Sequence, residues 1–321
     1  MPKDSVLAAG IDTAKDKLDV AVHGQAAALS VDNCRAGWRA VVRHLAGLGV
    51  ARVAIEASGG YERGVVAHLR QAGFVVLVVQ PLQVKAWARL HLRRAKNDAI
   101  DAALIAACAA LLEPAAIAPD ERLGVLADHL TYIEQIEDDI ARHKTRLEHL
   151  HDTRLRRCIG SDIKRLEKRR ERELHRIVAQ LEDHADLKRR FELVLSVRGI
   201  GLRTALAIVI RLPELGRISR EEAAALAGLA PFDNDSGRHK GERHIAGGRG
   251  RLRRSLYAAA SIARRWNPAL EALYKRLIGR GKAHKAAVVA CARKLLVYAN
   301  TVVARGLAWR PNPQDAKTLI V

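Results

Sequence analysis

Short apolar runs separated by polar turns dominate the first 115 residues. Residues 6–12, 18–22, 52–56 and 74–79 are rich in Val, Ile, Leu and Ala and have the length of strands, the last of them typical of a buried parallel strand. Helices are expected over residues 36–48, 62–72 and 82–92, and residues 98–112 run almost wholly apolar after a polar start, as in a helix buried on most sides. This alternation predicts an α/β domain with a mixed sheet over residues 1–115.

The pattern changes at about residue 116. Gly and Pro nearly vanish between residues 119 and 191, and Ile133, Ile136 and Ile140 begin an approximate heptad seam. A second apolar stripe follows, which predicts a helical hairpin or coiled coil over residues 116–190, with the break between helices at residues 158–161. Its many cations leave two interpretations open, a basic dimerisation arm and a solvated linker helix.

Residues 191–321 predict a mainly α domain with helices over 252–266, 269–278 and 283–305. Near its start, Gly199 and Gly201 form a Gly-x-Gly turn between two apolar helices, flanked by Arg198 and Arg203. Backbone N–H groups at such a helix start can hold a nucleic-acid phosphate. A plain helix–helix turn is the alternative.

The charge of the chain indicates what kind of partner it binds. The 321 residues carry a formal net charge of +20, spread along the chain, which favours a polyanion and above all nucleic acid. Aromatic residues make up only 4%, so phosphate contacts are favoured over base stacking. The four cysteines lie far apart without a CxxC pair, which argues against a zinc ribbon or a disulfide framework. No apolar run suggests a targeting segment or a membrane span, so a cytoplasmic location is expected.

Four acids are candidate metal ligands. Asp98 and Asp101 stand three residues apart at the start of the apolar helix, so both can share one face. Asp12 and Glu56 each end a predicted strand. If these elements end at one edge of the sheet, the carboxylates can hold one or two Mg²⁺ ions beside a phosphate. The alternatives are ordinary: helix-capping acids for the first pair, and a turn acid and a solvated strand end for the second.

A long Gly-rich loop over residues 226–254 carries a candidate nucleophile. Ser236 lies between Asp235 and Gly237, and a serine hydroxyl can attack a phosphodiester when cations stabilise the developing charge. A common Asp-Ser-Gly turn is the alternative. Neighbouring candidates for charge stabilisation or nucleic-acid binding are Arg238, Lys240, Arg243, His244, Arg249, Arg251, Arg253 and Arg254.

Together these segments resemble the DEDD transposases of the insertion-sequence family numbered one hundred and ten, which includes bridge-RNA-guided recombinases. The specific matches are residues 10–12, 55–59, 96–102 and 228–231, and the stretch from Asp235 to Arg254. The resemblance implies an RNase H-like (RuvC-like) domain over residues 1–115, a coiled-coil middle over 116–190 and a C-terminal transposase domain over 191–321 with a helix-hairpin-helix-like element.

The resemblance also implies chemistry and partners. Asp12, Glu56, Asp98 and Asp101 would be the DEDD acids that hold Mg²⁺, and Ser236 the nucleophile that forms a phosphoserine linkage. Donor and target DNA, a structured noncoding guide RNA, and dimers that form a tetramer on paired DNA would be the partners, in a nucleoid-associated bacterial protein. Two other classes stay open: a Holliday-junction-resolvase-like endonuclease in which Mg²⁺-activated water cuts, and a non-catalytic nucleic-acid-binding protein.

Overall fold

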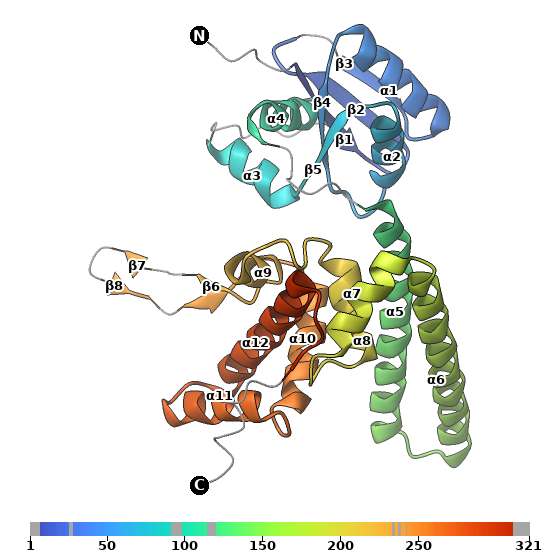
Figure 1. Cartoon of the computed structure of the whole chain (residues 1–321). Helices are drawn as coiled ribbons and strands as arrows, with labels where there is room; N and C mark the ends of the chain where they lie inside the picture. The colour runs from blue at the N-terminus through green and yellow to red at the C-terminus, as the bar shows by residue number, and fades with distance from the viewer. Residues whose placement is uncertain are drawn as a thin grey trace. The chain divides into compact units, whose positions relative to one another are not determined.

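The computed structural model describes residues 7–25, 28–90, 98–113, 120–232, 235–236, 239–241 and 243–310, with the backbone alone at residues 98–100, 235–236 and 239–240. The chain divides into two compact units, Met1–Ala118 and Pro119–Val321 (Figure 1). We describe each unit separately.

A five-stranded mixed sheet forms the centre of the first unit. Its strands are β1 (Ala8–Thr13), β2 (Lys17–Val22), β3 (Ala28–Asp32), β4 (Arg52–Glu56) and β5 (Val75–Val79), in the order β3-β2-β1-β4-β5. β1 pairs antiparallel with β2 and parallel with β4, and β4 pairs parallel with β5. The predicted α/β fold with a mixed sheet is therefore confirmed.

Helices cover both faces of this sheet (Figure 1). On one face, α1 (Arg35–Gly47) and α2 (Arg63–Gln71) pack against the side chains of Ile11 and Ile55. On the other, α3 (Pro81–Leu90) and α4 (Asp98–Leu111) pack against Ala8 and Ala54. Successive strand residues point to opposite faces of the sheet. The faces assigned to these four residues therefore also give the face of every other residue in β1 and β4.

The sequence predictions for this unit differ from the structure in two places. β3 was not predicted, because its residues alternate between exposed and half-buried and lack a long apolar run. β5 was predicted to be buried, but it lies at the edge of the sheet, and Val75 and Val78 are 44% and 41% exposed. An apolar run alone does not distinguish a central strand from an edge strand.

A long helical hairpin begins the second unit. α5 (Glu121–His149) and α6 (Thr153–Glu182) pack along each other, with Ile136 and Ile140 of α5 buried against Ile163 of α6. The predicted break at residues 158–161 is wrong, because α6 continues through it. The chain turns instead at residues 150–152, where the carboxylate of Asp152 accepts a hydrogen bond of 2.7 Å from the backbone N–H of Leu155 and caps α6.

Six further helices complete this unit, as the mainly α prediction requires. They are α7 (Ala185–Leu195), α8 (Leu202–Arg211), α9 (Arg220–Leu226), α10 (Gly250–Ala263), α11 (Pro268–Gly279) and α12 (His284–Arg305). Within the described residues, α12 alone has the length and apolarity of a membrane span, and half of its apolar window is buried in the unit. Its buried side chains, such as Leu295 and Leu296, belong to the core shared with α8 and α10, which is the behaviour of a core helix.

Candidate functional site

Helix α4 lies directly on strand β1 in the first unit. A Cβ added at Gly10 would overlap the backbone of α4 at Ala102 and Ala106 and approach the carbonyl carbon of Ile105 to 2.7 Å. Only glycine permits this distance between a strand and a helix. In the Gly10-Ile11-Asp12 motif, Gly10 therefore allows α4 to pack on β1, and Asp12 is the candidate metal ligand.

Asp12 and Glu56 share one face of the sheet. Strand residues two apart point the same way, so Asp12 follows Gly10 towards α4, and Glu56 follows Ala54, which packs in the cluster containing α4 residues. β1 and β4 are parallel neighbours with Ile11 opposite Ile55. The two acids therefore stand side by side, one position beyond this pair, and both are half-buried.

The direction of α4 follows from its contacts at the other end. Arg52, at the start of β4, donates hydrogen bonds from Nη1 to the carbonyl oxygens of Ala109 and Leu112, at 3.3 and 3.1 Å. Ala102 lies over Gly10, further along the parallel strands. α4 thus runs opposite to β1 and β4, and its first residues lie towards the strand ends that carry Asp12 and Glu56.

Three described acids therefore lie at one corner of this unit. Asp101 is one turn before Ile105, which is fully buried against the sheet, and position 98 is one turn before Ala102. The side chain of Asp98 lies outside the described residues. Carboxylate oxygens suit a hard cation such as Mg²⁺. Among the described side chains, however, no three Asp, Glu, His or Cys groups lie close enough to hold a metal ion.

Asp19 is an acid at this corner that was not predicted. It lies directly opposite Asp12 in the β1–β2 pairing, so it shares the same face. Like charges opposite each other destabilise a sheet, and here Lys17 forms an ion pair with Asp19 at 2.9 Å. The sequence could have suggested this acid, because Lys17 and Asp19 lie two residues apart in the predicted second strand and therefore share one face of it.

The turn after Glu56 is ordered by Glu62. Its carboxylate accepts hydrogen bonds from the backbone N–H groups of Gly60, at 2.8 Å, and Ser58, at 3.1 Å, and from the Ser58 hydroxyl, at 3.1 Å. Burial raises the pKa of Glu62, but these bonds outweigh burial and leave the pKa below its ordinary value. Gly59 and Gly60 have φ of 77° and 116°, which glycine adopts without strain. The Glu-Ala-Ser-Gly-Gly motif therefore builds a rigid turn after Glu56.

In the second unit, the described part of the predicted loop forms two short antiparallel strand pairs. We call the segment over residues 231–245 the Ser236 arm. β6 (Pro231–Phe232) pairs with β9 (His244–Ile245), and β7 (Asp235–Ser236) pairs with β8 (His239–Lys240). Ser236 is opposite His239 in the β7–β8 pair. The side chains of Ser236 and Lys240 are outside the described part of the chain, as is all of Arg238.

Several predicted phosphate-binding arginines have partners within the protein. Arg203 donates from Nε and Nη2 to Glu137 at 3.1–3.2 Å and forms an ion pair with Glu134 at 3.0 Å. Arg251 pairs with Glu134 at 2.6 Å, and Arg249 forms a two-pronged pair with Glu214 at 2.6 and 2.7 Å. Burial raises the pKa of Glu134, yet the arginines hold it below its ordinary value.

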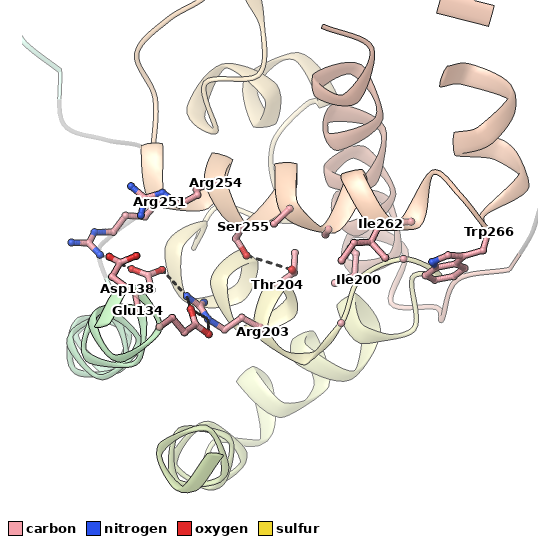
Figure 2. A pocket seen from close by; sticks show the side chains of 16 residues that line it. Glu134, Asp138, Ile200, Arg203, Thr204, Arg251, Arg254, Ser255, Ile262 and Trp266 are labelled. Carbon is pink, nitrogen blue, oxygen red and sulfur yellow. Dashed lines mark hydrogen bonds and ion pairs between the residues drawn. The ribbon is translucent and has the colours of Figure 1, made fainter. Parts of the chain in front are cut away.

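The Gly-x-Gly turn borders a pocket of about 530 Å³ between α5, α8 and α10 (Figure 2). Gly199 has φ of 115°, and Asn267, the N-cap of α11, donates to the Arg198 carbonyl at 2.6 Å, so the turn is fixed to the start of α11. Gly201 caps α8 without a side-chain hydrogen bond. The Arg198 guanidinium lies 5.6 Å from the ring centre of Trp266, which is 46% exposed.

The remaining predicted cations lie at the ends of the arm and on α10. Arg243 and His244 are exposed on the returning strand of the arm, and Arg254 is exposed at the pocket rim (Figure 2). Arg253 donates from Nη1 to the carbonyl oxygens of Gly228 and Gly247, at 3.3 and 2.6 Å.

A mixed sheet bearing acids at the ends of its central strands is consistent with an RNase H-like DEDD domain. Comparison with known families bears this out: a model of IS110-type DEDD transposases matches residues 9–153, and a model described as transposase IS116/IS110/IS902 family matches residues 191–275. The chain belongs to the IS110 family of transposases, and it is a DNA transposase or recombinase.

Two similar proteins match most of the chain, and a third matches about a third of it. A pilin gene-inverting protein of Moraxella bovis is 26% identical over 313 residues, which cover 92% of this chain and 94% of the relative. A pilin gene-inverting protein of Moraxella lacunata is 28% identical over 78% of this chain and 79% of its own length. An uncharacterised IS110 protein of Streptomyces coelicolor is 32% identical over 31% of this chain and 25% of its own.

Proposed function

We propose that this transposase cuts and rejoins DNA through a covalent phosphoserine linkage at Ser236, assisted by Mg²⁺ held by Asp12, Glu56, Asp98 and Asp101. One observation carries the metal site: α4 runs opposite to β1 and β4, so its first residues lie towards the strand ends bearing Asp12 and Glu56. The four acids are separated by up to 89 positions in the sequence, and the fold brings their elements to one corner.

Mg²⁺, when bound, supplies charge stabilisation at the phosphate oxygens. The chain supplies the rest. The Ser236 hydroxyl loses its proton and its oxygen attacks phosphorus. A bond between the serine oxygen and phosphorus forms as the bond between phosphorus and one sugar oxygen breaks, and the released sugar oxygen takes up a proton. A sugar hydroxyl from another strand later attacks the same phosphorus and releases the serine. The phosphodiester energy is conserved, so rejoining needs no nucleotide cofactor.

The nucleic-acid contacts we propose surround the Gly-x-Gly pocket and the arm. Gly201 is the N-cap of α8 and makes no side-chain hydrogen bond to its first turn. Arg254 lines the pocket that this turn borders, and Arg198 lies over the lining residue Trp266. His244 lies on β9 of the arm, opposite Phe232 of β6, and Arg243 precedes it in the chain. We infer that donor and target DNA are bound here.

Two further partners rest on the family resemblance. We propose a structured noncoding guide RNA that selects both DNA partners, and a dimer that assembles into a tetramer on paired DNA. The α5–α6 hairpin is long enough, at 29 and 30 residues per helix, to act as the dimerisation arm. Two relatives are named pilin gene-inverting proteins, and inversion of a gene is a DNA rearrangement, which supports recombination as the activity of this chain.

A recombination assay on a plasmid carrying donor and target sites tests the metal role. Asp12→Asn and Asp98→Asn are expected to reduce recombination in Mg²⁺ by at least about 10²-fold, because each removes a charge from the proposed site. Asp16→Asn is the matched control: this acid is exposed in the β1–β2 turn, four residues from Asp12. Full recombination by either site variant would refute the metal role.

A further inference from the structure

The two ends of the Ser236 arm meet at a tightly packed base. On the outgoing side, the N–H groups of Leu229 and Ala230 donate to the Ala224 carbonyl at the end of α9, at 2.8 and 3.2 Å. On the returning side, the Arg249 N–H donates to the Leu226 carbonyl at 2.8 Å. Both ends are thus anchored on one helix, before and after the arm.

Two glycines bring these ends into backbone contact. A Cβ added at Gly248 would overlap the backbone nitrogen of Gly228 and lie 2.6 Å from its Cα. A Cβ added at Gly228 would overlap the Gly247 carbonyl oxygen and the Arg253 guanidinium. Gly228, Gly247 and Gly248 all have φ between 61° and 67°, the left-handed region that favours glycine.

Arg253 closes this base from α10. Its Nη1 donates to Gly247 on the returning side and to Gly228 on the outgoing side, at 2.6 and 3.3 Å. Such charge-assisted bonds to carbonyls are stronger than neutral ones. Next to it, Arg249 is fixed by its two-pronged pair with Glu214. The Arg253 guanidinium therefore joins the segment that precedes the arm to the segment that follows it.

We propose that Arg253 is a positioning residue for strand cleavage: together with Gly228 and Gly248 it fixes the direction in which the arm presents Ser236. This inference rests on the proposed function of Ser236. In the described part of the arm each strand pair is two residues long, and such short pairings add little stability by themselves, so the packed base sets the direction of the arm. A nucleophile displaced by about 1 Å loses on the order of 10² in rate.

The sequence suggested a different role for Arg253, contact with a DNA phosphate, and salt dependence separates the two. A lost phosphate contact lowers the slope of log Kd against log salt concentration by about one. If Arg253 instead positions the arm, the Arg253→Ala variant keeps both the slope and Kd near the wild-type values. Its rate of protein–DNA linkage falls by about 10²-fold, and Arg253→Lys, which reaches one carbonyl with a single ammonium, recovers part of that rate. Arg265→Ala, an exposed arginine two residues beyond the end of α10, is the matched control.

A distance measurement tests the clamp independently of chemistry. Nitroxide labels at Phe232→Cys on β6 and Arg276→Cys on α11, in a Cys34→Ser and Cys158→Ser background, report the arm against the body of the same unit. The distance distribution is expected to be narrow, to broaden in Arg253→Ala and to stay narrow in Arg265→Ala.

An unchanged distribution in Arg253→Ala would overturn the clamp, and a salt slope lowered by one would assign Arg253 to phosphate binding instead. If the wild-type protein forms no linkage at all, the proposed serine chemistry fails while the distance measurement still decides the clamp.

Discussion

Arg211 on α8 donates a hydrogen bond from Nη2 to Oε2 of Glu134 on α5, at 2.9 Å, although 77 positions separate them. Glu134 is 8% exposed and also pairs with Arg203 and Arg251. One carboxylate near the middle of α5 thus joins this helix to α8 and α10 (Figure 2).

We expect Glu134→Gln to lower the free energy of unfolding of the second unit by about 3 kcal/mol, since it leaves the largely buried guanidinium of Arg211 without its ion pair. Urea denaturation followed by circular dichroism measures this. Glu148→Gln, an exposed acid near the end of the same helix, is the control and should change stability by less than about 0.5 kcal/mol. Equal effects of the two substitutions would contradict the role of Glu134.

The same carboxylate predicts a pH dependence. The pKa of Glu134 is held below its ordinary value of 4.5. A group whose folded-state pKa is depressed contributes stability above its unfolded pKa and loses that contribution as the pH falls through the folded pKa. The stability difference between wild type and Glu134→Gln should therefore be full at pH 7 and shrink below about pH 4.5. A difference that stays constant down to pH 3 would argue against the ion pairs.

Gly10→Ala should disrupt the packing of α4 on β1. The new Cβ meets helix backbone, which has no side-chain rotamer to relieve the overlap, so we expect a loss of at least about 2 kcal/mol in the first unit. Gly47→Ala at the end of α1 is the matched control, because a Cβ there meets nothing within 4 Å. It should be neutral or stabilise by about 0.5 kcal/mol. Thermal denaturation of both variants checks the contrast.

Two of the four cysteines should react with a maleimide in the native protein at pH 7.5. Cys34 and Cys158 are exposed, whereas burial raises the pKa of Cys108 and of Cys291 to about 11. Mass spectrometry of intact protein should show two additions in buffer and four in denaturant. Rapid labelling of Cys108 would mean that α4 does not stay packed on the sheet.

Much of the architecture follows from local patterns. The alternating apolar runs predicted the mixed sheet, and the polar start of the apolar helix predicted α4 close to its observed bounds. The five consecutive apolar residues of β5 do not reveal that this strand lies at the edge of the sheet. The misplaced hairpin break shows another limit of such patterns, because Gly160 sits in open space inside α6 and breaks nothing.

The site was predictable in part. Strand ends and a helix start led to the prediction that Asp12, Glu56 and Asp101 are metal ligands, and this stays a prediction. The direction of α4, which brings their elements to one corner, depends on contacts such as Arg52 with Ala109. For the arginines, the sequence shows their charge but not which group each guanidinium contacts. Arg253 and Arg254 are neighbours in sequence, yet one closes the base of the arm and the other is exposed at a pocket rim.

The most direct test of the proposed mechanism is to locate the bond between protein and DNA. Wild-type protein is incubated with a nicked substrate that prevents rejoining, digested with protease and analysed by mass spectrometry. We predict a nucleotide adduct on the peptide containing Ser236, formed in Mg²⁺, absent from Ser236→Ala and strongly reduced in Asp12→Asn. Cleaved DNA without any adduct, or an adduct that persists in Ser236→Ala, would contradict the account.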